Sequence, residues 1–286
     1  EGKYLNFNDF KKIVDEGSQY GCPSISPQGN NEPFLIKDLH KYINYAHKKG
    51  FIDIMLNNNG SALTPRRCQE ALDSGLTRMR FSLDAFTPET YSKVRVGSLP
   101  LEKVIRNIDT FLELKEKGNY KLPVTGVSFV KMKHNEHELD DFVKFWEGKA
   151  DSIGIQDLVG IMEGFGKKTD EELKQTKLKG DFRCAQPFQR VTMRYNGTIL
   201  PCCTFYAAEM PIGQLKSKAN TKFSEIDNIG LLDKTIKSKL IIGTIQEIWK
   251  SKQMEFIRDI HKKGEFWKHP ICKTCVLSTS HFDSTQ

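Results

Sequence analysis

Cysteine is the residue type whose spacing in this chain points most directly to chemistry. The Cys272-x-x-Cys275 pair can hold one metal centre from a tight turn. A hairpin over residues 191–200 would bring Cys184 towards Cys202, because the two strands of a hairpin run antiparallel. Four converging thiolates could hold a Cys₄ zinc ion or a [4Fe–4S] cluster. Spacing alone leaves both open, together with thiols that bind no metal.

The distribution of the seven cysteines also indicates a compartment. A secreted disulfide scaffold is small and carries its cysteines along its whole length, whereas five of the seven here follow residue 183. This pattern is more typical of an intracellular metal site, so we expect a cytoplasmic protein. Cys22 and Cys68 fall in or beside expected core elements, and we interpret both as buried and unreactive.

The charge balance argues against two classes of partner. The net charge of +7 comes from Lys and Arg residues that are interleaved with acids on expected helices, which is typical of a solvated surface. No apolar run approaches the ~20 residues that a membrane span requires. We therefore expect neither nucleic acid nor a membrane as a partner.

The first part of the chain alternates between expected strands and helices. Thr64-Pro65 and Thr87-Pro88 each have the pattern of a helix start, with threonine as the N-cap and proline at the first helical position. Strands joined by single helices require parallel crossovers, which predicts an α/β fold with its ligand beyond the carboxyl ends of the strands. The expected strands cover residues 22–26, 51–56, 79–83, 123–132 and 153–158.

The pattern changes after about residue 160. Residues 161–183 are polar and indicate a linker, and residues 207–239 indicate a polar insertion. Asn196-Gly197 is a hairpin signal between two short strands. Residues 244–263 carry an apolar stripe that predicts one helix. Earlier in the chain, Asn135 and Glu138 resemble a capping box that would open a helix over residues 139–146.

Several segments together resemble the radical S-adenosylmethionine (SAM) enzymes, specifically the group with a SPASM or shorter twitch domain at the C-terminus. Their order and spacing extend from about residue 6 to residue 275, and they favour an iron–sulfur cluster over zinc. In the first half the matching residues are Asn30-Asn31-Glu32-Pro33, Asn58-Asn59-Gly60, Phe81-Ser82-Leu83-Asp84-Ala85, Tyr91, Arg95 and Asn135-Glu136-His137-Glu138. In the second half they are Cys184-Ala185-Gln186-Pro187-Phe188, Asn196-Gly197-Thr198, Cys202-Cys203, Gly243, Glu247-Ile248-Trp249, Arg258, His261 and Pro270-Ile271-Cys272-Lys273-Thr274-Cys275.

The resemblance implies an architecture and a cofactor site. A partial (β/α)6 barrel would occupy residues 1–160, and an iron–sulfur (SPASM/twitch) domain would follow the linker over residues 184–286. SAM would lie across the strand ends, and an auxiliary [4Fe–4S] cluster would leave Cys203 free. By resemblance, the SAM contacts are Asn30, Asn31 and Glu32 at the amino group, Ser82 and Arg95 with Asp84 nearby at the carboxylate and ribose, and the backbone around Ile155 and Gln156 at the adenine. The cluster ligands would be Cys184, Cys202, Cys272 and Cys275.

Two departures from the family pattern stand out. Asn30 and Asn31 replace two glycines, and asparagine tolerates a left-handed backbone better than most residues do. The CxxxCxxC motif that holds the catalytic [4Fe–4S] cluster is absent from this chain, and the family places it upstream of Glu1. We expect an N-terminal segment to be missing, so that the ligands of the catalytic cluster lie outside this sequence and the chain alone cannot cleave SAM. A lineage that has lost the chemistry is the alternative.

The implied function is generation of a 5′-deoxyadenosyl radical and abstraction of a hydrogen atom from a substrate. The twitch-like cysteine spacing points to dehydrogenation of a sugar or cyclitol, whereas other members of the family modify peptides. The expected partners are therefore a small-molecule or peptide substrate and an electron donor such as flavodoxin or ferredoxin. The alternative is a non-catalytic binding module that keeps a structural Cys₄ metal site and a remnant barrel.

Overall fold

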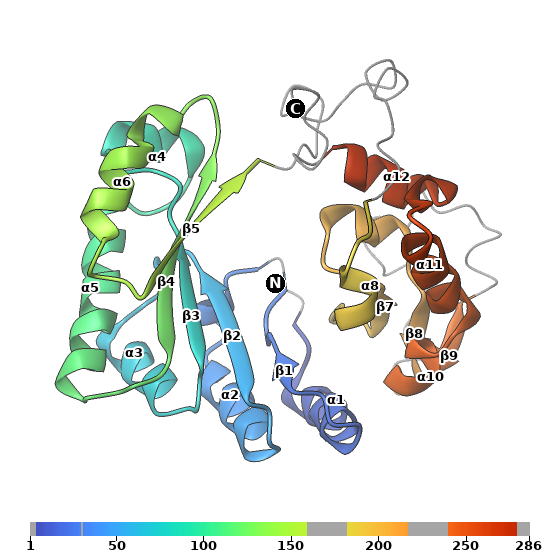
Figure 1. The fold of residues 1–286 in the computed structure, drawn as a ribbon. Helices are drawn as coiled ribbons and strands as arrows, with labels where there is room; N and C mark the ends of the chain where they lie inside the picture. The colour runs from blue at the N-terminus through green and yellow to red at the C-terminus, as the bar shows by residue number, and fades with distance from the viewer. Residues whose placement is uncertain (1–3, 30, 159–181, 217–239, 279–286) are drawn as a thin grey trace. The chain divides into compact units, whose positions relative to one another are not determined.

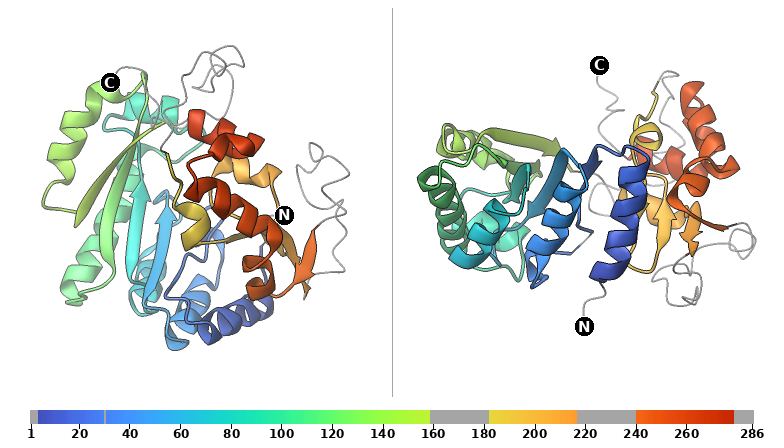
Figure 2. Two further views of the ribbon diagram at one scale, coloured as in Figure 1. Left: turned by 45° about the vertical axis from the view of Figure 1, so that its right-hand side comes forward. Right: turned by 90° about the horizontal axis from the view of Figure 1, so that it is seen from below.

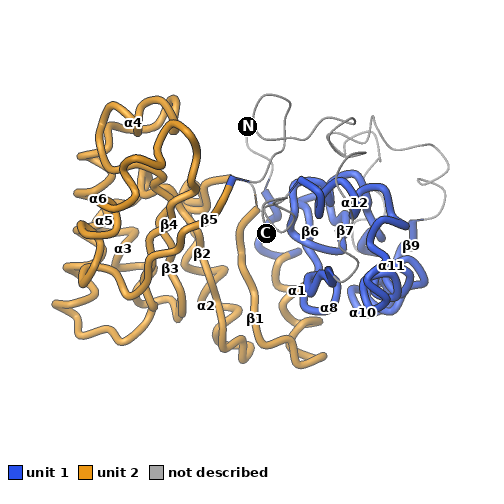
Figure 3. Tube along the Cα trace, turned by 45° about the horizontal axis from the view of Figure 1, so that its top comes forward, with its two compact units in different colours: residues 1–9, 158–286 blue, residues 10–157 orange. Residues whose placement is uncertain are grey.

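The chain falls into two compact units, which are considered separately (Figure 3). A computed structural model describes residues 4–29, 31–158, 182–216 and 240–278. One unit comprises residues 10–157, and the other comprises residues 1–9 with residues 158–286. None of the helices in the described ranges combines the length and the apolar character that crossing a bilayer needs.

The first unit is built on a parallel sheet of five strands in the order β1-β2-β3-β4-β5. This confirms the α/β fold, and the described residues contain five strands of the expected (β/α)6 barrel. The elements from the N-terminus are α1 (Phe7–Gln19), β1 (Ser24–Ile25), the 3₁₀ turn η1 (Pro33–Leu35), α2 (Leu39–Lys48), β2 (Asp53–Asn58), α3 (Pro65–Leu72), β3 (Arg78–Ser82), α4 (Pro88–Val94), α5 (Leu101–Lys117), β4 (Val124–Lys131), η2 (Glu136–Glu138), α6 (Leu139–Trp146) and β5 (Ser152–Asp157) (Figure 1).

Helices α3, α5 and α6 cover one face of this sheet (Figures 1 and 2). The strands present alternate side chains to that face, because successive residues of a strand point to opposite sides. Phe81 of β3 is fully buried there and meets the ring of Phe111 of α5 edge to face, with 5.7 Å between centroids. The opposite face, which we call the polar face, carries Asp53, Met55, Asn57, Arg78, Arg80, Ser82, Gly126, Ser128, Ser152, Gly154 and Gln156.

Local signals placed two helix starts correctly. The hydroxyl of Thr64 accepts the backbone N–H of Arg67, and the hydroxyl of Thr87 accepts that of Thr90, each with proline at the next position. Of the two early cysteines, Cys68 is fully buried, and burial raises the pKa of its thiol to about 12. The prediction for Cys22 was wrong: this residue is exposed, in the segment between α1 and β1.

The second unit contains a four-stranded sheet in the order β6-β7-β8-β9 and a set of short helices. The predicted hairpin is confirmed, since Thr192 pairs with Leu200 across a turn in which Gly197 has a φ of 84°. The elements are α8 (Gln186–Gln189), β6 (Thr192–Met193), β7 (Thr198–Leu200), η3 (Phe205–Glu209), β8 (Gly213–Leu215), β9 (Ile241–Gly243), α10 (Ile245–Trp249), α11 (Lys252–Lys262), η7 (Phe266–Lys268) and α12 (Pro270–Leu277).

Residues 244–263 form two helices, where the sequence predicted one. Thr244 and Glu247 form a capping box at the start of α10. Two residues beyond the end of α10, the hydroxyl of Ser251 accepts the backbone N–H of Met254 and so caps α11. A serine whose hydroxyl accepts a backbone N–H three residues later starts a new helix rather than continuing the previous one, which explains the break. The predicted insertion also contains β8, while residues 217–239 and most of the expected linker lie outside the described residues.

The predicted capping box at Asn135 and Glu138 was wrong, because neither side chain caps a helix. The Glu138 carboxylate instead accepts the backbone N–H of Phe86 at 2.7 Å and that of Thr87 at 3.2 Å, and it also bonds the hydroxyl of Thr87. Burial alone would raise the pKa of Glu138, but hydrogen bonds, first among them that from Thr87, outweigh it and lower the pKa. The ionised carboxylate of Glu138 therefore connects the start of α6 to the loop after β3 through hydrogen bonds.

Glu138→Gln should lower the free energy of unfolding at pH 7 by ~1.5–3 kcal/mol, the range for hydrogen bonds to a charged group. Because the pKa of Glu138 in the folded protein lies below its usual 4.5, this stabilisation is present above that pH. It is lost as the pH falls through the lowered value. Urea denaturation at pH 7 and below pH 4.5 measures both effects. The exposed Glu136→Gln is the control, and equal losses for the two variants would contradict the assignment.

Candidate functional site

The loops after β1 and β2 are joined by Glu32. Its Oε2 accepts the backbone N–H of Asn59 at 2.8 Å, and its Oε1 accepts that of Phe34 at 3.1 Å. Burial raises the pKa of this carboxyl, and the two backbone bonds partly offset that rise. Glu32 thus lies half-buried beyond the carboxyl ends of two neighbouring strands, where a parallel α/β sheet binds its ligand.

The ends of β3 and β4 are joined by Asp84. Its backbone is left-handed, with a φ of 62°, which is uncommon for residues other than glycine but best tolerated by Asp and Asn. In this conformation Oδ1 accepts the backbone N–H of Val130 at 2.8 Å, and Oδ2 pairs with Nη2 of Arg95. The buried amide of Asn135 donates to the carbonyl oxygens of Asp84 and Val130, each at 2.8 Å.

Arg95 and Ser82 keep hydrogen-bonding capacity for a ligand. The Nε of Arg95 is buried and finds no acceptor among the described residues, although the side chain as a whole is 27% exposed. The Ser82 hydroxyl is half-buried, and among the described residues its side-chain hydrogen bond is one from the Ser128 hydroxyl, at 3.5 Å. A carboxylate or a ribose hydroxyl would satisfy these donors, so the rim fits the polar part of SAM.

The other predicted SAM contacts are Asn30, Asn31 and Gln156, and among the described residues Asn31 and Gln156 have no side-chain hydrogen bond that would mark them as part of the site. Asn30 lies outside the described residues, and Asn31 is exposed beside Glu32. Gln156 is exposed on β5, in register with Val130. Sequence reasoning singled out Asn135 as a capping residue and as part of a family-matching segment, but it missed the hydrogen bonds from its amide to Asp84 and Val130.

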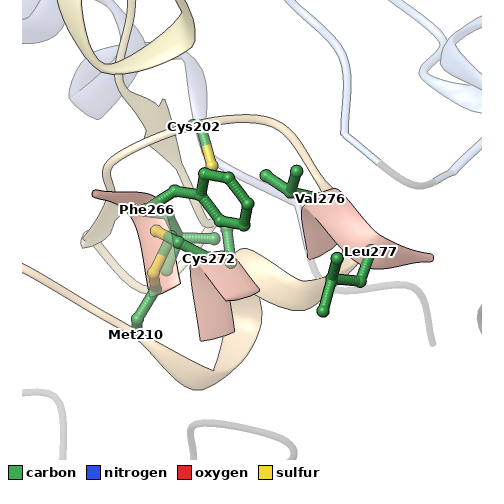
Figure 4. Close-up of a cluster of buried hydrophobic side chains, with 8 residues drawn as sticks. Cys202, Met210, Phe266, Cys272, Val276 and Leu277 are labelled. Atoms are coloured by element: carbon green, nitrogen blue, oxygen red, sulfur yellow. The ribbon is translucent and has the colours of Figure 1, made fainter. Parts of the chain in front are cut away.

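Two of the four predicted cluster ligands lie in the core of the second unit. Cys202 and Cys272 are 6% and 5% exposed, within an apolar cluster that includes Phe266 (Figure 4). Burial, reinforced by neighbouring thiols, raises the pKa of each of them to about 12. Cys184 and Cys275 are half-buried, and burial raises their pKa values as well.

These thiols fit a metal cluster in type and number. No three Cys, His, Asp or Glu side chains in the described ranges are placed to hold a single metal ion. A buried thiolate without a cation is unfavourable, whereas an iron centre lowers the pKa of its thiol ligands. Cys203 is exposed and contacts Gln186 and Arg190, in the bend that follows β7.

Helix α11 holds the segment that carries Cys184. Arg258 donates to the carbonyl oxygens of Pro187 at 3.0 Å and Trp249 at 2.9 Å, and its guanidinium stacks on the Trp249 ring. His261 Nδ1 accepts the backbone N–H of Cys184 at 3.4 Å. Burial, with a smaller effect of a neighbouring histidine, lowers the pKa of His261 to about 4, so its ring is neutral at pH 7.

Comparison with known families places the chain. The family described as the Radical SAM superfamily matches residues 2–145, which is half of the sequence. The chain belongs to the radical SAM superfamily. It is 34% identical over 113 residues to a probable GTP 3′,8-cyclase of Methanococcus maripaludis, a match covering 40% of this chain and 37% of that one. It is 31% identical over 142 residues to a GTP 3′,8-cyclase of Desulforamulus reducens, covering 49% and 41%. The chain thus spans less than half the length of these curated relatives.

Two solved structures share the fold of this radical SAM chain. One is BtrN in complex with AdoMet and 2-DOIA, with 15% identity and a TM-score of 0.53 over 96% of this chain and 81% of that one. The other is SuiB of Streptococcus suis bound to S-adenosylmethionine, with 14% identity and a TM-score of 0.59 over 94% and 64%. At these identities the likeness is one of fold.

Anaerobic reconstitution should give a brown protein in which iron and sulfide fall sharply on Cys202→Ser. On the predicted ligand set, the loss of one of four thiolates would remove a ligand and loosen helix α12, which carries Cys272 and Cys275. The adjacent, exposed Cys203→Ser should leave iron and sulfide unchanged and serves as the matched control. Zinc without sulfide in the wild-type protein, or equal damage by Cys203→Ser, would show that this ligand set is wrong.

Proposed function

We propose that this chain binds SAM at the strand ends of its sheet and acts in hydrogen-atom abstraction from a substrate. The reaction would dehydrogenate a sugar or cyclitol, or modify a peptide. The observation that carries the proposal is Arg95: it is held by Asp84 at the end of β3, and its buried Nε lacks an acceptor among the described residues. Membership of the radical SAM superfamily supports the same ligand at the same edge.

The substrate classes rest on the comparisons. The SuiB structures include one bound to the precursor peptide SuiA, which supports a peptide as one class. BtrN was solved with AdoMet and 2-DOIA, which supports a small molecule as the other. Because the curated relatives are named GTP 3′,8-cyclases, GTP is a further small molecule to test.

The described residues would divide the work between binding and positioning. When bound, SAM and a reduced catalytic cluster supply a 5′-deoxyadenosyl radical, with one electron from a donor such as flavodoxin or ferredoxin in the cytoplasm. Glu32 would orient the amino group, since both of its oxygens are already fixed by backbone N–H groups. Asp84 holds Arg95 in place for the carboxylate or ribose. Cys184, Cys202, Cys272 and Cys275 would hold an auxiliary [4Fe–4S] cluster, which when bound would supply an acceptor for the second electron of an oxidation.

Calorimetric titration of this chain with SAM tests the proposal. Arg95→Ala should weaken binding by ~1.5–3 kcal/mol, because a charge-assisted hydrogen bond to the ligand is removed. The control is Arg78→Ala. It also removes a guanidinium, but Arg78 is the first residue of β3 and pairs with Asp53, the first residue of β2, at the opposite ends of these strands from Arg95. It should leave the affinity for SAM unchanged. If Arg95→Ala binds SAM as tightly as the wild-type chain does, Arg95 is not part of the site.

A further inference from the structure

The polar face of the sheet carries an arginine that the described residues do not pair. Arg80 and Ser82 are two residues apart on β3, so their side chains leave the same face of the strand. Arg80 is half-buried. Its guanidinium makes no hydrogen bond or ion pair with any other residue in the described ranges. The backbone of β3 therefore holds a positive charge over the sheet without a partner from the described fold.

Arg78 provides an internal comparison. It lies on the same face of the same strand, two residues earlier. Its Nε and Nη2 donate to the two carboxylate oxygens of Asp53, at 2.7 and 2.6 Å. Asp53 is the only acid among the residues of β2 to β5 that belong to the polar face. Since Arg78 pairs with that acid, no acid of the polar face on these strands is left to pair with Arg80.

Two glycines form the surface beneath the Arg80 side chain. A Cβ built on Gly126 of β4 would lie 3.9 Å from Nε of Arg80, and one built on Gly154 of β5 would lie 3.9 Å from its Cζ. The side chain therefore reaches from β3 across β4 to β5, over positions that carry no side chain. The hydroxyl groups of Ser128 and Ser152 belong to the same face. The glycine backbone beneath Arg80 and the neutral serine hydroxyls of this face supply no negative charge.

We propose that Arg80 binds an oxyanion of the substrate, a carboxylate or a phosphoryl group, on the polar face of the sheet. The inference rests on the proposed function, because the substrate would lie beside SAM at the strand ends. A half-buried guanidinium without a partner is unfavourable, and an oxyanion gives it two parallel charge-assisted bonds. Arg80 therefore selects an acidic peptide or a phosphorylated small molecule over a neutral sugar or cyclitol.

Equilibrium dialysis in the presence of SAM tests this with two matched pairs of probes. GTP against guanosine tests the phosphoryl group, and an acetylated, amidated Gly-Glu-Gly peptide against its Gly-Gln-Gly counterpart tests the carboxylate. The wild-type chain should bind at least one anionic probe more tightly than its neutral counterpart. Arg80→Gln should weaken that binding by roughly ten- to a hundredfold, the effect of losing a charge-assisted bond. The probe that responds identifies the oxyanion.

The control is Arg78→Gln, which removes the same charge from the same face and should leave anion binding within about twofold of the wild-type value. Equal weakening by both variants, or no preference for either anion, would overturn the proposal. Thermal melts followed by circular dichroism check folding. If Arg80→Gln does not fold, Arg80→Lys takes its place. This variant should weaken anion binding less, because lysine keeps the positive charge and loses only the paired N–H donors of the guanidinium.

Titration with SAM separates this inference from the proposed function. Arg80→Gln should keep the SAM affinity of the wild-type chain, because Arg80 is not among the residues assigned to SAM. A wild-type chain that binds no SAM would refute the proposed function. The anion preference would still be decided by the comparison of Arg80 with Arg78.

Discussion

The geometry of the strand ends depends on the hydrogen bond and the ion pair that the Asp84 carboxylate makes. This carboxylate connects three parts of the chain: the end of β3, the backbone of Val130 in β4, and the guanidinium of Arg95. Its left-handed backbone is held in place by the buried amide of Asn135, while Glu138 fixes the next residues of the loop. A left-handed backbone costs free energy, and the surrounding hydrogen bonds must offset that cost. Residues held in this way are common at binding sites. The result is a cation held at the rim before any ligand arrives.

The second unit depends on a different constraint, which is the burial of thiols. Cys202 and Cys272 lie in an apolar cluster where a bare thiolate would be strongly disfavoured. A thiol set of this kind is inert until a metal centre supplies positive charge, and the metal then adds to the stability of the unit. Arg258 and His261 fix the backbone around Cys184 through bonds that do not use the thiols. The same unit thus combines a small core with a potential ligand set.

The sequence predicted features whose causes are local. The parallel sheet followed from strands that alternate with helices, the starts of α3 and α4 from Thr-Pro pairs, and the hairpin from Asn-Gly. The sequence did not predict interactions between residues that are far apart in the chain. Glu138 has the spacing of a capping residue, yet its carboxylate bonds residues about 50 positions away in the chain. Arg78 and Arg80 are equivalent in sequence, and only the position of Asp53 shows which of them lacks a partner. Local pattern therefore locates elements, while the pairing of polar groups requires the fold.

The central claim is that Glu32 and Arg95 hold SAM at one edge of the sheet. A crystal structure of this chain grown with SAM tests it most directly. The account predicts electron density for the amino acid part of SAM against the loop of Glu32, and a contact from Nε of Arg95 to the carboxylate or ribose. Density for SAM elsewhere on the chain, or an Arg95 that still contacts only Asp84 when SAM is bound, would contradict it.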